Sequence, residues 1–315
     1  INYWKFLQFK FFEQWKKLKQ YAKEKELQIV GDIPIYVALD SADVWSHPEL
    51  FQLDEENLTP LKVSGVPPDA FSEDGQLWGN PLYDWEKMEQ TDFAWWRSRM
   101  KASAKLYDAV RIDHFIGVVQ YYAIPYGAVT AKDGESEKGP GKKLTDALDE
   151  AAGETKIIAE DLGVFCQEVK DLLAETGYPG MKIIEFAFSG DRFNEHLPHC
   201  YDPNSVVYGG THDNETLAGY FKPEKRQWWE LQYIADYLGA AHQSEVVDRV
   251  FRAAYGSVAS VAIFQMQDVL KLDNWARMNT PGTLGENWRW RLVPGQFTDE
   301  RADYLSWLVD TFGRF

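Results

Sequence analysis

The sequence is poor in cysteine and has no long apolar run. Its 315 residues include 2 cysteines, Cys166 and Cys200, and no Cys-x-x-Cys motif. This excludes a framework of several disulfides and favours a reducing compartment. No apolar stretch reaches the length of a membrane-spanning helix, and the first residues do not resemble a secretory signal peptide. We therefore expect a cytoplasmic protein with no membrane partner.

Positive charge is also in deficit, with 33 Lys and Arg against 49 Asp and Glu, a formal net charge of −16. Binding to a phosphate backbone requires Lys and Arg to displace counterions, so nucleic acid is not an expected partner. Hydrophobic residues make up 45% of the chain, which suffices for one large domain or two small ones. The 13 tryptophans suit stacking on sugar rings, although most aromatic residues are expected to fill the core.

Short apolar runs alternate with segments of helical periodicity. Strands are predicted at 28–37, 107–113, 156–160, 181–186, 205–210 and 257–264. Helices are predicted at 3–27, 91–106, 143–153 and 165–176, with further helical segments near 215–253. Strands that alternate with helices are typical of a parallel sheet with helices on its faces.

Charged residues stand at the carboxyl ends of three predicted strands. Asp113 follows Arg111 at the end of one strand, Glu160 ends the next, and His212 and Asp213 end a third. Breaking a glycosidic bond requires an acid for the leaving oxygen and a carboxylate for the anomeric carbon, so this pattern favours glycosyl chemistry. Asp213 could bind sugar hydroxyls and strain the ring toward an oxocarbenium-like state, with His212 donating a further hydrogen bond.

The first two carboxylates differ in their expected environment. Arg111 lies two residues before Asp113 and so points to the same side of the strand, where it would keep that carboxylate ionised as a nucleophile. Glu160 follows the apolar residues 157–159, so desolvation should raise its pKa and suit it to act as the acid. The adjacent Asp161 should add like-charge repulsion to this effect.

The same residues allow other interpretations. Asp113 and Arg111 by themselves could form a structural ion pair. Glu160 could begin a helix, where acidic residues complement the helix dipole. Asp113, Glu160, His212 and Asp213 together have donor atoms for a metal. The sequence lacks a His pair with ligand spacing, so no metal site is expected.

Active sites of (β/α)8 barrels lie at the carboxyl ends of the strands, where these carboxylates stand. We therefore expect an α/β fold of the (β/α)8 TIM-barrel type, with residues 1–315 as one catalytic domain. Six strands do not close such a barrel, and the chain opens with a helix, so two further strands are expected in a preceding N-terminal region. The polar, Pro- and Gly-rich segment after the 28–37 strand predicts an inserted lid-like subdomain at about 38–100. Residues 124–142 are expected to be loop.

A series of motifs resembles the 4-α-glucanotransferases, also called amylomaltases or disproportionating enzymes (glycoside hydrolase family 77). The resemblance extends from Asn2 to the end of the chain. The motifs are Gly31–Val37 (GDIPIYV), Asp40–Trp45 (DSADVW), Gly65–Asp69 (GVPPD), Gly75–Tyr83 (GQLWGNPLY), Arg111–Phe115 (RIDHF), Lys138–Gly141 (KGPG), Ala159–Gly163 (AEDLG), Thr211–Asn214 (THDN) and Asn287–Leu292 (NWRWRL).

The resemblance implies retaining transfer of α-1,4-glucan segments between maltooligosaccharides, amylose and glucose, without a metal or organic cofactor. It implies that Asp113 forms the covalent intermediate and that Glu160 protonates the departing glucan and then deprotonates the incoming 4-hydroxyl. Asp213 would stabilise the transition state, with Arg111 and His212 assisting.

The resemblance also implies substrate-binding residues. The loop with Asp69, Phe71 and Trp78 would cover the acceptor side, Phe186 would stack on the acceptor, and Asn279 would contact the substrate. Glu135–Lys138 stands where relatives usually carry Trp-Val before the Lys-Gly-Pro-Gly motif. An α-glucan hydrolase with water as acceptor, or a glucan-binding protein without turnover, remain the alternatives.

Overall fold

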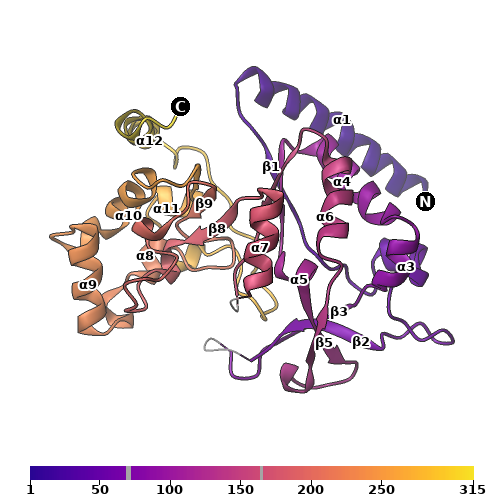
Figure 1. Cartoon of the computed structure of the whole chain (residues 1–315). Helices are drawn as coiled ribbons and strands as arrows, with labels where there is room; N and C mark the ends of the chain where they lie inside the picture. The colour runs from indigo at the N-terminus through magenta and orange to yellow at the C-terminus, as the bar shows by residue number, and fades with distance from the viewer. Residues whose placement is uncertain (69–71, 164–165) are drawn as a thin grey trace. The chain divides into compact units, whose positions relative to one another are not determined.

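The computed structural model describes residues 1–68, 72–163 and 166–315. These residues form two compact units, Ile1–Pro179 and Gly180–Phe315 (Figure 1). Each unit contains a three-stranded parallel sheet. Within the described ranges, no helix has both the length and the apolar character needed to cross a bilayer.

The parallel sheet of the first unit has the order β1 (Val30–Ile33), β4 (Ala109–Ile112), β7 (Lys156–Ala159). All four residues of the central strand β4 are buried, as expected for a strand covered on both faces. Its register sets Arg111 beside Asp32 of β1 and beside Ile158 of β7. The three predicted strands of this region are confirmed, each in a shorter form.

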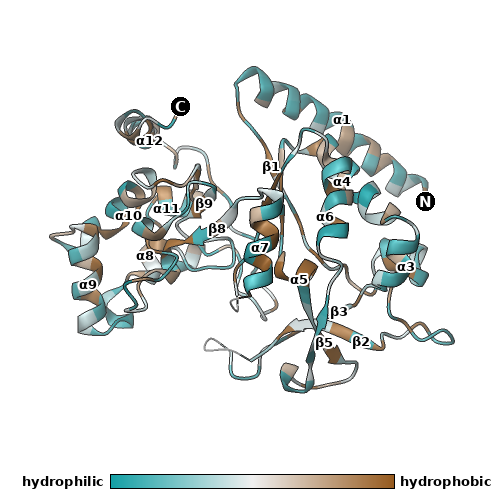
Figure 2. Cartoon of the chain, in the orientation of Figure 1, coloured by the Kyte–Doolittle hydropathy of each residue, from teal (hydrophilic) through white to brown (hydrophobic). Residues whose placement is uncertain are grey.

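The longer helices of the first unit lie close to their predicted positions, and three shorter ones were not predicted. They are α1 (Asn2–Glu24), α4 (Ala94–Leu106), α6 (Lys142–Ala152) and α7 (Gln167–Thr176), with the shorter α2 (Ala42–Ser46), α3 (Trp85–Gln90) and α5 (Ile116–Val119). Figure 2 shows polar and apolar residues side by side along α7, which buries Val169 and Leu172. The helix ends at Gly177 with φ 71°, a left-handed cap that glycine adopts without strain.

A separate antiparallel sheet corrects the loop predicted at 124–142. Its order is β3 (Gln76–Pro81), β2 (Lys62–Val66), β5 (Gln120–Pro125), β6 (Glu135–Lys138). The segment expected to form a subdomain, 38–100, supplies two strands of this sheet, β2 and β3. The other two strands come from residues that follow β4, so the sheet combines two distant segments of the chain. The lid-like role of 38–100 stays a prediction.

The parallel sheet of the second unit has the order β10 (Val261–Ile263), β9 (Ser205–Tyr208), β8 (Gly180–Ile183). The strand predicted at 181–186 is shorter, because Ile184–Phe186 form a 3₁₀ turn. The helices are α8 (Leu217–Tyr220), α9 (Trp228–Leu238), α10 (Val246–Tyr255), α11 (Met266–Val269) and α12 (Asp299–Phe312). The two sheets together thus contain all six predicted parallel strands.

Each unit has its own apolar core. Ile33, Trp96 and Leu148 belong to the core of the first unit. Phe251 and Leu308 belong to the core of the second. In both units the core lies between the parallel sheet and its helices, which leaves the carboxyl ends of the strands to carry polar side chains.

Candidate active site

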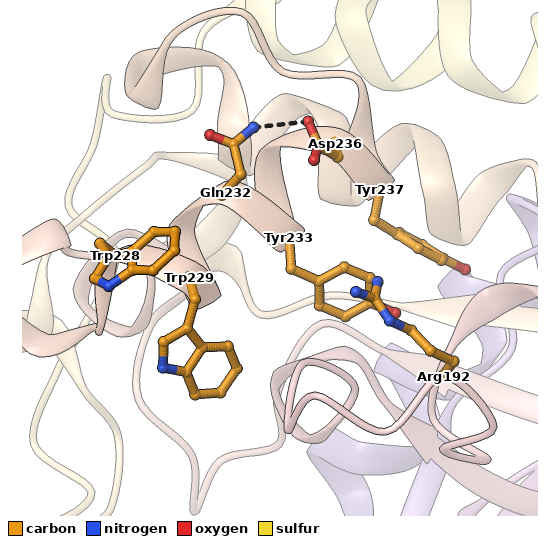
Figure 3. A pocket seen from close by; sticks show the side chains of 7 residues that line it. All are labelled: Arg192, Trp228, Trp229, Gln232, Tyr233, Asp236 and Tyr237. Atoms are coloured by element: carbon orange, nitrogen blue, oxygen red, sulfur yellow. Dashed lines mark hydrogen bonds between the residues drawn. The ribbon is translucent and has the colours of Figure 1, made fainter.

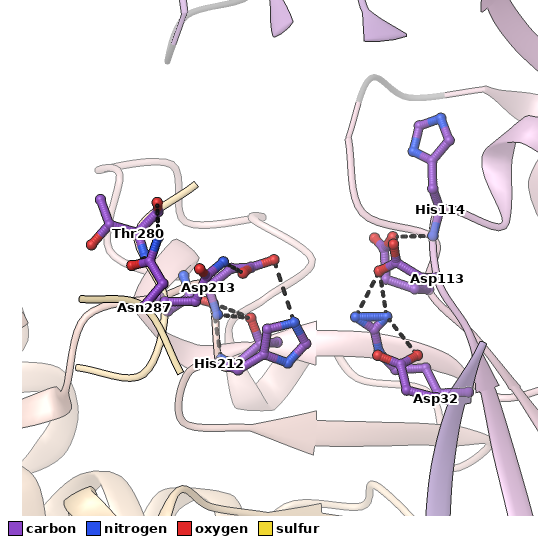
Figure 4. A network of polar contacts seen from close by, with 12 residues as sticks. Asp32, Asp113, His114, His212, Asp213, Thr280 and Asn287 are labelled. Carbon is purple, nitrogen blue, oxygen red and sulfur yellow. Dashed lines mark hydrogen bonds and ion pairs between the residues drawn. The ribbon is translucent and has the colours of Figure 1, made fainter. Parts of the chain in front are cut away.

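Arg111 is the centre of an acidic cluster in the first unit, whose carboxylates Asp32 and Asp113 are labelled in Figure 4. Its Nη1 and Nη2 donate to Oδ1 of Asp113 at 2.6 and 2.8 Å. Its Nη1 also lies 3.5 Å from Oδ1 of Asp32. The arginine side chain is 9% exposed, whereas that of Asp113 is 40% exposed. A buried cation therefore holds a carboxylate that solvent or a substrate can reach, and two charge-assisted hydrogen bonds stabilise the ionised carboxylate.

Glu160 follows β7 and is held by main-chain N–H groups. Its Oε2 accepts from the amide of His114 at 2.6 Å, and its Oε1 accepts from the amide of Leu162 at 2.8 Å. Burial and, to a lesser extent, the negative charge of Asp113 raise the pKa of Glu160 to about 7, against the opposing effects of Arg111 and of the two main-chain hydrogen bonds. The rise in pKa predicted from the apolar sequence is confirmed, and Asp113 contributes like-charge repulsion to it. The repulsion expected from Asp161 stays a prediction.

His114 links this cluster to the antiparallel sheet. Its φ of 51° is left-handed, which is uncommon for a residue other than glycine. Burial lowers the pKa of His114 to about 4, so its imidazole is neutral at pH 7. The ring of Trp78, on β3, meets the imidazole edge-on with centroids 4.8 Å apart. The structure therefore brings Trp78, predicted to bind substrate, next to the residue that follows Asp113.

Asp213 is the centre of a polar cluster in the second unit. Its Oδ1 accepts from Nδ2 of Asn279 at 2.6 Å, and its Oδ2 lies 3.6 Å from Nε2 of His212. Nη2 of Arg277 donates to the main-chain carbonyl of Asp213 at 2.5 Å. The indole of Trp288 lies 4.9 Å from the imidazole of His212, ring centre to ring centre. These contacts fix the orientation of Asp213 before any ligand is bound.

The second unit also contains a pair of buried acids. Glu185 is 2% exposed and Asp268 is 0% exposed. Among the described residues, no hydrogen-bond partner reaches Oε1 of Glu185 or Oδ2 of Asp268. Burial raises the pKa of Asp268 to about 7, and burial together with the charge of Asp268 raises that of Glu185 well above its usual range. Both groups therefore hold a proton at pH values where an exposed carboxyl has lost it.

The remaining predicted residues are placed as follows. Phe186 is half-buried, and its ring packs edge-on against His196 with centroids 5.5 Å apart. Asp69 and Phe71 lie outside the described residues. No three His, Cys, Asp or Glu side chains within 1–68, 72–163 and 166–315 are grouped in a way that could hold a metal ion.

Three contacting residues were missed as site residues from the sequence alone. Asp32 faces Arg111 because the two are register partners, and the signal was a carboxylate inside a buried strand. Arg277 begins the loop after η7 (Asn274–Ala276) and reaches Asp213 from 64 residues away. Trp288 belongs to a quoted motif, but no periodicity connects it to His212.

This geometry can be set beside known proteins. The sequence profile described as "4-alpha-glucanotransferase" matches residues 1–296. The protein described as "4-alpha-glucanotransferase" from Clostridium butyricum is 50% identical over 314 residues, which cover 100% of this chain and 64% of that protein. The chain belongs to the 4-alpha-glucanotransferase family.

Other members of the 4-alpha-glucanotransferase family agree. The relative from Synechocystis sp. is 48% identical over 316 residues, covering 100% of this chain and 62% of that protein. The structure "Amylomaltase from Streptococcus agalactiae in complex with acarbose" has a TM-score of 0.93 at 42% identity and covers 98% of this chain and 62% of that chain. The family and the α/β fold class predicted from the sequence are confirmed. The chain spans less than two thirds of the length of these relatives.

Proposed function

We propose that this chain carries the catalytic residues of a 4-alpha-glucanotransferase. The observation that carries the proposal is the contrast between two carboxyl groups of the first unit. Burial and repulsion raise the pKa of Glu160 to about 7, whereas Asp113 is only partly buried and is bound to Arg111. A protonated carboxyl and an ionised carboxylate in contrasting environments are what retaining glycosyl transfer requires.

The proposed reaction has two displacements. In the first, a carboxylate oxygen of Asp113 attacks the anomeric carbon of the donor, the bond to the leaving oxygen breaks, and Glu160 gives its proton to that oxygen. In the second, Glu160 takes the proton of an acceptor 4-hydroxyl, whose oxygen displaces Asp113 from the anomeric carbon. Asp213 is assigned to stabilise the oxocarbenium-like transition states, with Arg111 and His212 assisting.

The acceptor decides between transfer and hydrolysis. We assign Asp69, Phe71, Trp78, Phe186 and Asn279 to substrate binding, with the aromatic rings on the acceptor side. The place of Trp78 against His114 supports this assignment for one of them. Maltooligosaccharides, amylose and glucose are the proposed donors and acceptors, and the two displacements require no metal or organic cofactor. The six parallel strands are proposed to be part of an eight-stranded (β/α)8 barrel.

A cytoplasmic location is also proposed. Its support is the scarcity of cysteine together with the state of Cys166 and Cys200, which are free thiols in the structure. Two unpaired thiols are compatible with a reducing compartment.

The direct test is incubation of the purified protein with maltotriose, with the products separated by chromatography. Transfer gives glucose together with maltooligosaccharides longer than the substrate. The matched pair of variants is Glu160→Gln, which removes the proposed acid, and Glu150→Gln, which removes a carboxyl that is 71% exposed. We expect kcat to fall roughly 10²- to 10⁴-fold in the first variant, the usual contribution of general acid–base catalysis, and to stay unchanged in the second.

Other outcomes would replace the proposal. Products that are only shorter than maltotriose would identify a hydrolase with water as acceptor. Glucan binding with no turnover would identify a non-catalytic binding protein. Equal rates for the two variants would remove Glu160 from the reaction.

A further inference from the structure

The second unit has a groove along helix α9 that no step of the proposed reaction uses. It has a volume of about 420 Å³ and is lined by α9 and by Arg192 (Figure 3). This volume falls within the range of small-molecule sites. The helix is preceded by Gln227, whose main-chain N–H donates to Oε2 of Glu230 at 2.7 Å, and is followed by Gly239 with φ 65°. The helix that carries the groove is therefore capped at both ends.

One row of groove residues combines an aromatic ring with hydrogen-bonding groups. Trp228, Gln232 and Asp236 follow one another at intervals of four residues on α9, which is about 6 Å per step along a helix. Trp228 is 78% exposed. Nε2 of Gln232 donates to Oδ1 of Asp236 at 2.9 Å, which holds an amide and a carboxylate in fixed positions in this row.

All residues of the neighbouring row are aromatic, and each contacts a residue outside the helix. Trp229, Tyr233 and Tyr237 repeat the four-residue interval. A Cβ added at Gly190 would lie 3.3 Å from Cζ3 of Trp229, so the indole packs closely on that glycine. The guanidinium carbon of Arg192 lies 3.7 Å from the ring centre of Tyr233. The hydroxyl of Tyr237 lies 2.9 Å from Nδ1 of His199. These contacts restrain the rings before a ligand arrives.

We propose that this groove is an auxiliary binding site for an α-glucan chain. The apolar faces of pyranose rings fit the exposed indoles, and their hydroxyls both donate and accept, which suits the amide and the carboxylate of Gln232 and Asp236. The charges of Arg192 and Asp236 offset each other, so a neutral polyol fits the groove better than a phosphate or an acidic peptide. The inference rests on the proposed function, because the ligand is the polymer on which the protein is proposed to act.

Binding in this groove should favour long glucans over short ones. A glucan chain bound to α9 raises the local concentration of glucan at the reacting carboxylates. A trisaccharide is too short to use both sites, so its binding at the carboxylates does not become tighter. The groove therefore affects the KM for amylose and not the chemical step.

The test is affinity electrophoresis of the protein in native gels with and without amylopectin, together with the KM values for amylose and maltotriose. The variants are Trp228→Ala and Gln232→Ala. The control is Trp275→Ala, because Trp275 is 69% exposed and lies on η7 of the same unit. We expect both groove variants to lose most of the retardation by amylopectin and to raise the ratio of the amylose KM to the maltotriose KM at least fivefold. Trp275→Ala should behave like the unmodified protein.

Two results would overturn the proposal. One is retardation that is absent in the unmodified protein or is equal in all variants. The other is a self-association, seen by sedimentation, that Trp228→Ala abolishes while glucan retardation persists, since the groove would then bind a second copy. Retardation does not depend on turnover, so loss of maltotriose transfer in every sample would refute the proposed function without deciding on the groove.

Discussion

At the scale of single residues, Arg111 affects two acids in different ways. It donates two hydrogen bonds to Asp113, and its positive charge lowers the pKa of Glu160 against the effect of burial. The proposed nucleophile and the proposed acid thus depend on the same guanidinium. A substitution at this position should change the pH profile of the reaction as well as its rate.

We expect Arg111→Gln to lower kcat by roughly 10²-fold, the usual effect of losing one preorganised electrostatic group. The protonated form of Glu160 is the active acid, so the rate of the unmodified protein should fall as pH rises through about 7. Without Arg111 the proton is held more tightly, and this alkaline limb should move to higher pH. The measurement is the pH dependence of kcat on maltotriose.

The matched control for Arg111→Gln is Arg97→Gln. Arg97 also pairs with two carboxylates, those of Asp92 and Glu150, at 3.0 and 2.7 Å, but it lies outside the cluster around Asp113. Its loss should leave the alkaline limb in place. An unshifted limb in Arg111→Gln, with a melting temperature like that of the control, would contradict the assigned electrostatic role.

At the scale of elements, Asp268 joins two short helices of the second unit. Its Oδ1, on α11, accepts from the amide of Leu217 at the start of α8 at 2.7 Å. Burial raises its pKa from the ordinary 3.8 to about 7. Between these values the folded protein holds a proton that the unfolded chain has released, so the free energy of unfolding falls as pH rises from about 4 to about 7.

Asp268→Asn should remove this contribution to the pH dependence of the free energy of unfolding. Asparagine keeps the acceptor for Leu217 and carries no charge, so the variant should be more stable at pH 7 to 8 by a few kcal/mol, since one unit of pKa corresponds to about 1.4 kcal/mol. Urea unfolding at pH 4.5, 6 and 7.5 measures it. The control is Asp310→Asn, an exposed residue of α12. A variant that is less stable at pH 7.5 would show that Asp268 is ionised in the folded protein.

The elements also show what sequence patterns can predict. The six parallel strands were found because buried strands such as β4 are nearly continuous apolar runs. The strand β6 was missed because Glu135–Lys138 has no apolar residue. It is stabilised by Lys62, whose Nζ lies 2.6 Å from Oε1 of both Glu135 and Glu137, and by the hydroxyl of Tyr121, which donates to Glu137 at 2.6 Å. Such pairing across distant segments leaves no local signal.

The same limit applies to the site. Asp113 and Arg111 were predictable as neighbours because side chains two residues apart on a strand share a face. The bond between Asn279 and Asp213 spans 66 residues, so only the resemblance to a family pointed to Asn279. The buried acids Glu185 and Asp268 had no signal, because burial of a carboxyl group depends on tertiary packing rather than on the local sequence.

At the scale of the whole molecule, the division into two compact units predicts two separable responses to core damage. Leu148 and Leu308 are both 0% exposed, and each belongs to the core of a different unit. Leu148→Ala and Leu308→Ala should each cost about 2 to 5 kcal/mol. Hydrogen exchange followed by mass spectrometry should show the loss of protection mainly in 1–179 for the first variant and mainly in 180–315 for the second.

The two leucine variants are controls for each other, because the change in side chain is the same. A loss of protection spread equally over both units in either variant would mean that the chain unfolds as one cooperative body. A loss confined to one helix would mean that neither core is cooperative.

The hydrogen bonds to Glu160 determine which substitutions its neighbours can tolerate. Both of its oxygens accept from main-chain N–H groups, those of His114 and Leu162, and every amino acid except proline supplies this donor. Exchanges of the side chain at Leu162 therefore leave the acid aligned. At His114 the constraint is the φ of 51°, which asparagine and glycine also accept. The backbone conformation thus sets the orientation of the Glu160 carboxyl, and this orientation can be kept when the neighbouring side chains are replaced.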